Sequence, residues 1–311
     1  KSTPEQLGTN ERIAKKRMQS IENKFRSDPQ FTLSYKNFIA EYRDLNHMER
    51  VLSSSEEGAY YLPHHAIIKN SSNTTRLRVV FDASANSSTG VSLNDLLAVG
   101  PKLQNDLCAI ILRSRLHKYL MTADINKMYR QIWIAPEDRK YQRVLWRDND
   151  NEPISTFQLK TVTYGTASAP FLAIRCLQQL ANESKDEYPH IYSVITNDFY
   201  MDDVVTGANT ISEIIKIRDD LVKVLLRGGF ELRKWVANDC TTLPINPSSE
   251  TSDREFEKGV INFDKEGEAK TLGLHWNCAQ DVLTYKISKN HMTRGRLPSG
   301  KYCPLHRKYL I

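Results

Sequence analysis

The chain has 311 residues, 40% of them hydrophobic, which is enough to bury a sizeable core in one large domain or two closely packed ones. The formal net charge is +6, but residues 286–311 carry seven Lys or Arg and no acid, so the other 285 residues sum to −1. This balance excludes a uniformly basic nucleic-acid-binding protein, and any affinity for phosphate must come from particular Lys and Arg side chains.

The N-terminal part of the chain predicts two helices. Residues 9–27 place apolar side chains among many charges at helical spacing, and Asp28 followed by Pro29 marks the start of a second helix. Residues 53–58 have the composition of a linker. We therefore expect an N-terminal helical extension over 1–58, a main domain over 59–289, and a basic, disordered tail over 290–311.

The main domain is predicted to contain interleaved strands and helices. Two strand-like runs, His64 to Lys69 and Leu77 to Phe81, flank a polar segment and predict a hairpin. The other predicted strands are 119–125, 200–206 and 271–276, and the predicted helices are 103–116, 166–181 and 211–226, the last ending at Gly228 and Gly229. Because no regular βαβ rhythm is present, we predict an α+β fold with helices on one face of a sheet.

Cysteine spacing and hydropathy narrow the setting in which the protein acts. The five cysteines lie far apart, and none has a Cys or His partner at the spacing of a zinc site. We expect reduced thiols in an intracellular protein. No run of eighteen apolar residues and no secretion signal is present, so we expect no membrane span.

Two segments place acids inside apolar, β-prone sequence. Asp202 and Asp203 lie within 199–205, and Asp124 follows the apolar run that begins at Leu120. For the adjacent pair alone, a solvated hairpin turn is the simpler interpretation. One acid on each of two neighbouring strands, however, is the layout of a two-metal phosphoryl-transfer site, and hard oxygen ligands favour Mg²⁺ over zinc.

The motifs around these acids resemble those of reverse transcriptases. Tyr200-Met201-Asp202-Asp203 is similar to the signature box of that family, and Asp124 stands where the family keeps its first catalytic aspartate. Four segments resemble the BEL/Pao class of LTR retrotransposon Pol polyproteins, namely 60–65, 78–85, 122–131 and 163–173. The resemblance extends from about residue 10 to about residue 290, in the order that the family keeps.

The resemblance implies a right-hand polymerase with palm and fingers, truncated without a complete thumb. Asp124, Asp202 and Asp203 would be the catalytic triad. Together with the backbone carbonyl of Ile125 they would hold two Mg²⁺ ions, with Mn²⁺ as the alternative metal. Lys234 is the candidate proton donor to the departing pyrophosphate, and an ordinary surface lysine is the alternative interpretation of it.

A second group of residues would bind the incoming nucleotide. Lys69 and Arg78 match the fingers residues that grip the triphosphate, with solvated strand-end cations as the alternative. Tyr129 occupies the place of the aromatic gate against a ribose 2′-hydroxyl, although an isolated aromatic is more often a core residue. Tyr164 and Gly165 match the motif that contacts nucleotide and template, where retroviral enzymes carry Gln-Gly.

The function that the resemblance implies is RNA-directed DNA polymerisation on an RNA or DNA template with its primer, using dNTPs. Residues 272–276 resemble the hairpin that positions the primer end. The alternative is an inactive or domesticated remnant that binds nucleic acid without polymerising, which the expected lack of a thumb favours. The expected setting is a retrotransposon particle in the cytoplasm, or the nucleus, with other Pol domains or a second polymerase chain as partners and no membrane.

Overall fold

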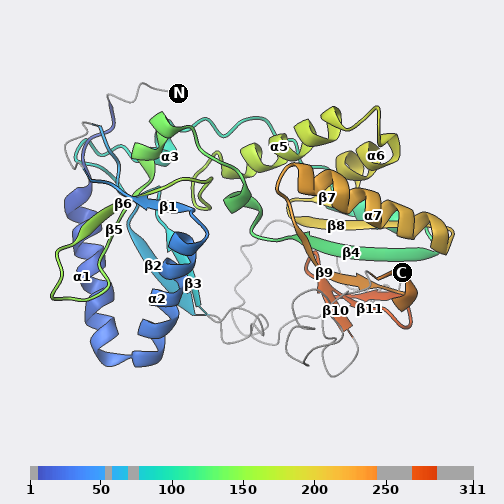
Figure 1. The fold of residues 1–311 in the computed structure, drawn as a ribbon, viewed down its shortest axis with the longest axis horizontal. Helices are drawn as coiled ribbons and strands as arrows, with labels where there is room; N and C mark the ends of the chain where they lie inside the picture. The colour runs from blue at the N-terminus through green and yellow to red at the C-terminus, as the bar shows by residue number, and fades with distance from the viewer. Residues whose placement is uncertain (1–5, 53–57, 69–76, 244–267, 286–311) are drawn as a thin grey trace, which may run out of the picture. The chain divides into compact units, whose positions relative to one another are not determined.

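The computed structural model of the protein describes residues 6–52, 58–68, 77–243 and 268–285. Two compact units are present. Unit 1 takes its residues from 1–103 and 127–176, and unit 2 takes its residues from 104–126 and 177–311, so each unit combines two separate stretches of the chain (Figure 1). The predicted division at residue 58 stays a prediction, and the predicted tail over 290–311 lies outside the described residues.

The two predicted N-terminal helices are confirmed in unit 1 as α1 (Glu11–Ser27) and α2 (Pro29–Asp44). Asp28 caps α2, because its Oδ1 accepts a hydrogen bond from the backbone N–H of Phe31 at 2.9 Å. Tyr35 of α2 is fully buried and stacks on Trp146, with ring centroids 5.7 Å apart. The helices therefore form part of the core of unit 1.

Unit 1 contains two small antiparallel sheets. The predicted hairpin is confirmed as β2 (His64–Ile68) paired with β3 (Leu77–Phe81), while its polar tip lies outside the described residues. The second sheet has the order β1 (Met48–Arg50), β6 (Ser155–Leu159), β5 (Arg143–Trp146), and none of its strands was predicted.

Short helical segments complete unit 1. The helix α3 (Leu93–Leu96) begins with a capping box, in which Ser92 and Asp95 satisfy each other's backbone N–H groups. The 3₁₀ helices η2 (Met128–Gln131) and η3 (Pro136–Gln142) precede β5. The helix predicted over 166–181 is confirmed as α5 (Ala169–Glu183), which runs from unit 1 into unit 2.

The sheet of unit 2 has four antiparallel strands in the order β7 (Phe199–Tyr200), β8 (Asp203–Ala208), β4 (Tyr119–Ile125), β9 (Leu232–Ala237). Strand β4 matches the prediction for 119–125. The run predicted as one strand over 200–206 is instead split, because the chain turns at Met201 and Asp202 between β7 and β8.

Both faces of this sheet are covered, so the prediction of helices on one face only is wrong. Figure 1 shows α6 (Pro189–Asn197) and α7 (Ile211–Arg227) on one face. On the other face, Ile110 of α4 (Leu107–Ser114) and Trp276 pack against Leu120 and Val205. Consistent with this, Leu120, Met121 and Ala123 are all buried, so the residues of β4 do not alternate between a buried and an exposed face.

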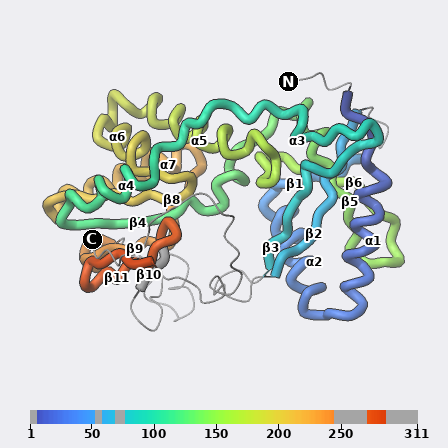
Figure 2. The backbone as a smooth tube through the Cα atoms, turned by 180° about the vertical axis from the view of Figure 1, so that it is seen from behind, coloured from blue at the N-terminus to red at the C-terminus, as the bar shows by residue number. Residues whose placement is uncertain are grey.

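The last described sheet has the order β10 (Glu268–Thr271), β11 (Leu274–Asn277), β12 (Val282–Thr284), and it lies on the side of the main sheet opposite α7 (Figure 2). The single strand predicted over 271–276 is wrong, because the chain reverses at Leu272 and Gly273, both with positive φ. The hairpin implied for 272–276 is thus present. No helix in the described part of the chain is long and apolar enough to cross a membrane.

Candidate active site

The predicted carboxylates meet where β4 and β8 pair in unit 2. Asp124 near the end of β4 is the direct cross-strand partner of Asp203, the first residue of β8. Asp202 precedes Asp203 in the turn, and its carbonyl oxygen accepts a hydrogen bond from the N–H of Ile125 at 2.7 Å. The backbone ladder therefore brings three acids from two separate stretches of chain to one place.

Like charges opposite each other on a sheet repel, and the protonation of Asp203 reflects this. Burial, followed by the nearby carboxylates of Asp202 and Asp124, raises the pKa of Asp203 to about 7, while Lys234 opposes the shift. A cluster of this kind is stabilised by positive charge, which the protein or a bound cation must supply.

Lys234 supplies one positive charge. Its ammonium group forms an ion pair with Oδ2 of Asp124, whose side chain is 20% exposed. The register between β4 and β9 shifts between Thr122 and Asp124, and Lys234 at this irregularity has a φ of 56°. A bulge re-aims a side chain that regular alternation would direct elsewhere, so the irregular strand explains how Lys234 reaches Asp124.

The donor set of the three acids fits a hard divalent cation, because carboxylate oxygens are the ligands that Mg²⁺ prefers. The three carboxylates are not, however, arranged as the ligands of one bound metal ion would be. Among the described residues, no three His, Cys, Asp or Glu side chains are grouped so as to hold a metal ion. The Ile125 side chain is buried, and the predicted role of its carbonyl as a ligand stays a prediction.

The turn that carries Asp202 is held by a residue that sequence analysis missed. Oε1 of Gln104 accepts a hydrogen bond from the N–H of Met201 at 2.8 Å, and its Nε2 donates to the carbonyl of Phe199 at 3.0 Å. Nothing in the sequence marks Gln104, because it is one polar residue in a polar segment before α4.

In unit 1, the structure brings Arg78, Tyr164 and Gly165 together beside β3. The guanidinium of Arg78 lies 5.6 Å from the ring centroid of Tyr164, and the Tyr164 hydroxyl donates a hydrogen bond to the carbonyl of Val79 at 2.8 Å. Gly165 has a φ of +104°, and a Cβ at this position would lie 2.3 Å from the carbonyl oxygen of Phe81. Only glycine fits this contact between the loop and β3.

Asn94 of α3 holds the other side of this loop, and sequence analysis missed it too. Its Oδ1 accepts a hydrogen bond from the N–H of Ala167 at 2.7 Å, and its Nδ2 donates to the carbonyl of Gly165 at 3.0 Å. The capping-box pattern of Ser92 and Asp95 could have revealed the helix, but it carries no signal for the contact with a loop 71 positions away.

Two other residues were predicted to bind the nucleotide. Tyr129 lies in η2 of unit 1 and is partly buried, and its role as a gate stays a prediction. Lys69 lies outside the described residues. Among the predicted nucleotide-binding side chains, Arg78 and Tyr164 contact each other.

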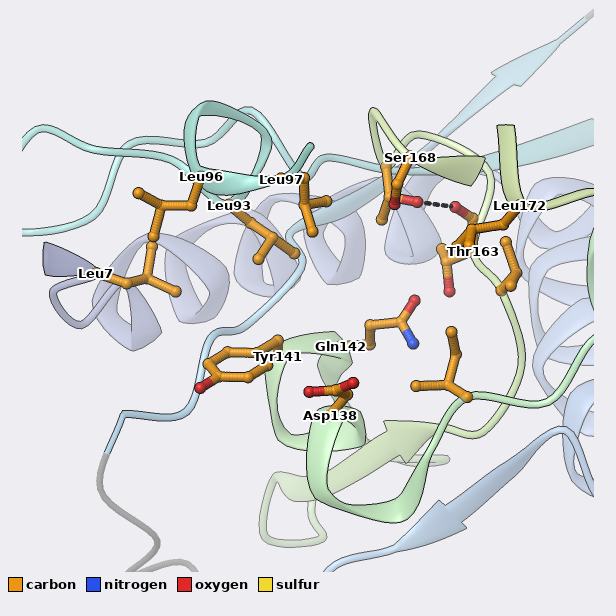
Figure 3. Close-up of a pocket in the computed structure, with 13 residues that line it drawn as sticks. Leu7, Leu93, Leu96, Leu97, Asp138, Tyr141, Gln142, Thr163, Ser168 and Leu172 are labelled. Carbon is orange, nitrogen blue, oxygen red and sulfur yellow. Dashed lines mark hydrogen bonds between the residues drawn. The ribbon is translucent and has the colours of Figure 1, made fainter. Parts of the chain in front are cut away.

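A cavity of about 280 Å³ in unit 1 is lined by Thr163 and Thr166, which lie on either side of Tyr164 and Gly165 in the chain. Its walls include Leu93 and Leu97 near Asn94, and Thr163 next to Tyr164. Figure 3 shows Gln142 extending into the space between these walls. Tyr164 itself packs against the core of unit 1, and the hydrogen bonds made by Asn94 and Tyr164 add polar contacts that hold the loop.

Comparison with known proteins assigns the chain to a broad class. The model of the family described as reverse transcriptase (RNA-dependent DNA polymerase) matches residues 65–235, more than half of the chain. A search of curated proteins finds no match. The matched range includes all the predicted site residues and ends immediately after Lys234.

Proposed function

The chain belongs to the reverse transcriptase family, and from that premise we propose that it is an RNA-directed DNA polymerase whose catalytic acids are Asp124, Asp202 and Asp203. Polymerases of this family act on nucleic acid templates with dNTPs and have a palm and fingers fold, with which the mixed helices and sheets agree. We propose that unit 2 is the palm and unit 1 belongs to the fingers.

The observation that carries the proposal is the cross-strand pairing of Asp124 with Asp203, with Asp202 in the adjoining turn. A structural role would not require three neighbouring acids, because their repulsion opposes folding. The raised pKa of Asp203 records that repulsion, after burial as the larger cause. The position of the acids is best explained by a positively charged ligand or substrate complex that they bind.

The acids would hold Mg²⁺ in the proposed reaction. When bound, the ions would activate the primer 3′-hydroxyl and neutralise the triphosphate charge. Asp124 and Asp203 orient their carboxylates through the strand pairing, and Asp202 does so through the turn. Lys234, now paired with Asp124, is the proposed proton donor to the departing pyrophosphate, since its ammonium group is half exposed and close to the acids.

The proposed nucleotide contacts in unit 1 are refined by the geometry of the loop. Arg78 is exposed and would bind the triphosphate as a charge-assisted donor. Tyr164 uses its hydroxyl on the carbonyl of Val79, so we propose that it supports Arg78 through its ring rather than binding nucleotide through the hydroxyl. Gly165 allows the backbone to approach β3 closely.

The finer assignment to a BEL/Pao-type LTR retrotransposon is also a proposal. It is supported by the segments 60–65, 78–85, 122–131 and 163–173, and by Tyr164 at the position where retroviral enzymes carry Gln. The substrates would be an RNA or DNA template annealed to a primer, together with dNTPs. Other Pol domains remain the proposed protein partners.

A primer-extension assay tests the enzymatic proposal. Wild type and Asp202→Asn would be compared on poly(rA)/oligo(dT) with dTTP and either Mg²⁺ or Mn²⁺. Asp219→Asn is the matched control, because Asp219 is an acid on α7 of the same unit that pairs with Arg218. We expect extension by wild type and by the control, and only background from Asp202→Asn.

Equal extension by wild type and Asp202→Asn, or none from either, would contradict the proposal. A gel-shift measurement with the same template-primer then separates the alternative function. Binding without extension by wild type would favour a remnant that retains affinity for nucleic acid but does not polymerise.

A further inference from the structure

Among the strands that the structure describes, none pairs with the outer side of β7. It is the first strand in the order β7-β8-β4-β9 and contains only Phe199 and Tyr200. Edge strands expose unpaired N–H and C=O groups. Because β7 is so short, it makes few backbone hydrogen bonds that could fix the turn that follows it. That turn carries Asp202 and leads directly into Asp203, so its position sets the position of two acids.

The side-chain amide of Gln104 makes hydrogen bonds on this outer side of β7, where a neighbouring strand would make them. The carbonyl of residue i and the N–H of residue i+2 point to the same side of a strand. Gln104 bonds to both, because its Nε2 donates to the Phe199 carbonyl at 3.0 Å and its Oε1 accepts from the Met201 N–H at 2.8 Å. One amide therefore makes the pair of bonds that a neighbouring strand would make.

The turn is consequently held from both sides within unit 2. On the β4 side, the N–H of Ile125 donates to the carbonyl of Asp202 at 2.7 Å. On the open side, Gln104 holds the adjacent residue, Met201. Each contact fixes one of the two residues between β7 and β8, in addition to the pairing of Tyr200 with Asp203 that closes the turn.

Met201 makes the second attachment important. Its φ is 55°, in the left-handed region that L side chains rarely adopt, and such a conformation persists only when its surroundings hold it. Gln104 makes the bond that holds the N–H of this residue. Without that bond, one of the contacts that hold Met201 in this conformation is lost, and the Asp202 carboxylate beside it becomes less well fixed.

We propose that Gln104 is a positioning residue that fixes the Met201–Asp202 turn and thereby the two acids that follow. The inference rests on the proposed function of those acids as ligands of a divalent ion. Gln104 acts through the turn and does not touch the reacting groups itself. Its loss should weaken metal binding and lower kcat while leaving KM for the nucleotide nearly unchanged.

The test compares Gln104→Met with Asn105→Ala in the full chain. Methionine keeps the length and bulk of glutamine but forms neither hydrogen bond. Asn105 is the matched control, because its Nδ2 donates to the Thr196 carbonyl at 2.5 Å and anchors the same segment to α6 without touching the turn. Mn²⁺ affinity would be measured by electron paramagnetic resonance, alongside kcat, KM and Tm.

For Gln104→Met we expect a loss of about tenfold in Mn²⁺ affinity, as when a group that orients a metal ligand is removed, with a similar loss in kcat. For Asn105→Ala we expect a lower Tm with wild-type Mn²⁺ affinity and kcat. Wild-type Mn²⁺ affinity in Gln104→Met, or equal losses in both variants, would overturn the inference, since the second result describes a general structural role.

Failure of the proposed function gives a different result. If wild type binds Mn²⁺ through Asp202 but extends no primer, polymerisation is refuted, while weaker Mn²⁺ binding by Gln104→Met still supports the positioning role. If wild type binds no Mn²⁺, the inference about Gln104 falls together with the metal site.

Discussion

In unit 2, Asp124 and Asp203 are placed by the backbone ladder between β4 and β8, whereas in unit 1 Tyr164 and Gly165 lie in a loop that individual side chains hold. The ladder consists of many main-chain bonds, so no single side chain determines the pairing of the acids. The loop is held by the side chains of Asn94 and Tyr164 and by the close approach of Gly165 to β3.

This difference indicates how each unit should respond to mutation. Polar side chains that bond to backbone can be removed one at a time, with local consequences. The nucleotide-contact loop should therefore lose its geometry through substitutions that leave the fold intact. The positions of the acids in unit 2 should change little when single side chains around the ladder are substituted, except at the turn that Gln104 holds.

Within unit 1, the largest effect is expected for Gly165→Ala. The new Cβ would lie 2.3 Å from the Phe81 carbonyl oxygen, and alanine is strained at a φ of +104°. Because a backbone atom cannot yield as a side chain does, the loop must move away from β3, and we expect at least a tenfold loss of kcat/KM, from roughly 2 kcal/mol or more of strain. Primer extension with varied dNTP measures it.

Gly90→Ala separates strain from collision in the same unit. Gly90 has a φ of +82°, but a Cβ there meets nothing within 4 Å. It should lose stability through backbone conformation alone, without a change in KM for the nucleotide. Equal effects of the two substitutions on KM would show that the contact of Gly165 with β3 is not what positions the loop.

A change of pH should weaken unit 1 through His64. Burial lowers the pKa of His64 from 6.5 to about 4, and the neutral ring lies between the Tyr35 hydroxyl and the Leu145 carbonyl. The unfolded chain binds a proton at this ring below pH 6.5 and the folded chain does not, so stability falls as the pH drops from 6.5 toward 4. The expected contribution of His64 to this loss is about 2 kcal/mol by pH 5.

Urea unfolding at pH 7.5, 6 and 5 measures this loss. As the pH falls, the free energy of unfolding of wild type should decrease relative to that of His64→Gln, which has no ring to protonate. The same pH dependence in both proteins would remove His64 as a cause, since the contributions of other groups such as His47 and Asp203 are common to both.

Asn94→Ala should have a smaller effect, confined to the loop. It removes the bonds to the Ala167 N–H and the Gly165 carbonyl, which together contribute about 1–2 kcal/mol. We expect KM for the nucleotide to rise about fivefold, with kcat nearly unchanged, because the acids lie in the other unit. Ser27→Ala is a suitable control, since Ser27 also bonds to a backbone carbonyl in unit 1 but is exposed at the end of α1.

Local signals in the sequence predicted the elements that depend on local chemistry. The cap at Asp28, the strand 119–125 and the strand Leu77 to Phe81 were each marked by residue types within a short window, and each is confirmed. The motifs also identified the acids, and their cross-strand pairing follows once β4 and β8 are adjacent.

The missed features depend on partners that are distant in the sequence. Strand β1 pairs with β6 more than a hundred residues later, and no local pattern specifies that pairing. The hold of Gln104 on Met201 spans 97 positions, and the bulge at Lys234 exists only in relation to β4. Such contacts use ordinary polar residues, whose composition is compatible with a solvated surface.

The smallest predicted effect is that of Tyr164→Phe, which separates the hydroxyl of Tyr164 from its ring. The substitution removes the bond to the Val79 carbonyl, which contributes about 1 kcal/mol, and keeps the ring beside Arg78. We expect a slightly lower free energy of unfolding and an unchanged KM for the nucleotide. Tyr164→Leu also removes the ring, and the loss of about 0.5–1 kcal/mol at the guanidinium should raise KM.

Tyr60→Phe is the matched control for the hydroxyl, because Tyr60 also donates to a backbone carbonyl in unit 1, that of Ala85. It should lose similar stability in urea unfolding with no change in KM. If Tyr164→Phe raises KM as much as Tyr164→Leu does, the hydroxyl and not the ring carries the nucleotide effect. Tyr164 would then contact the nucleotide as the retroviral-type motif implies, and the loop of unit 1 would depend on Asn94 and Gly165 alone.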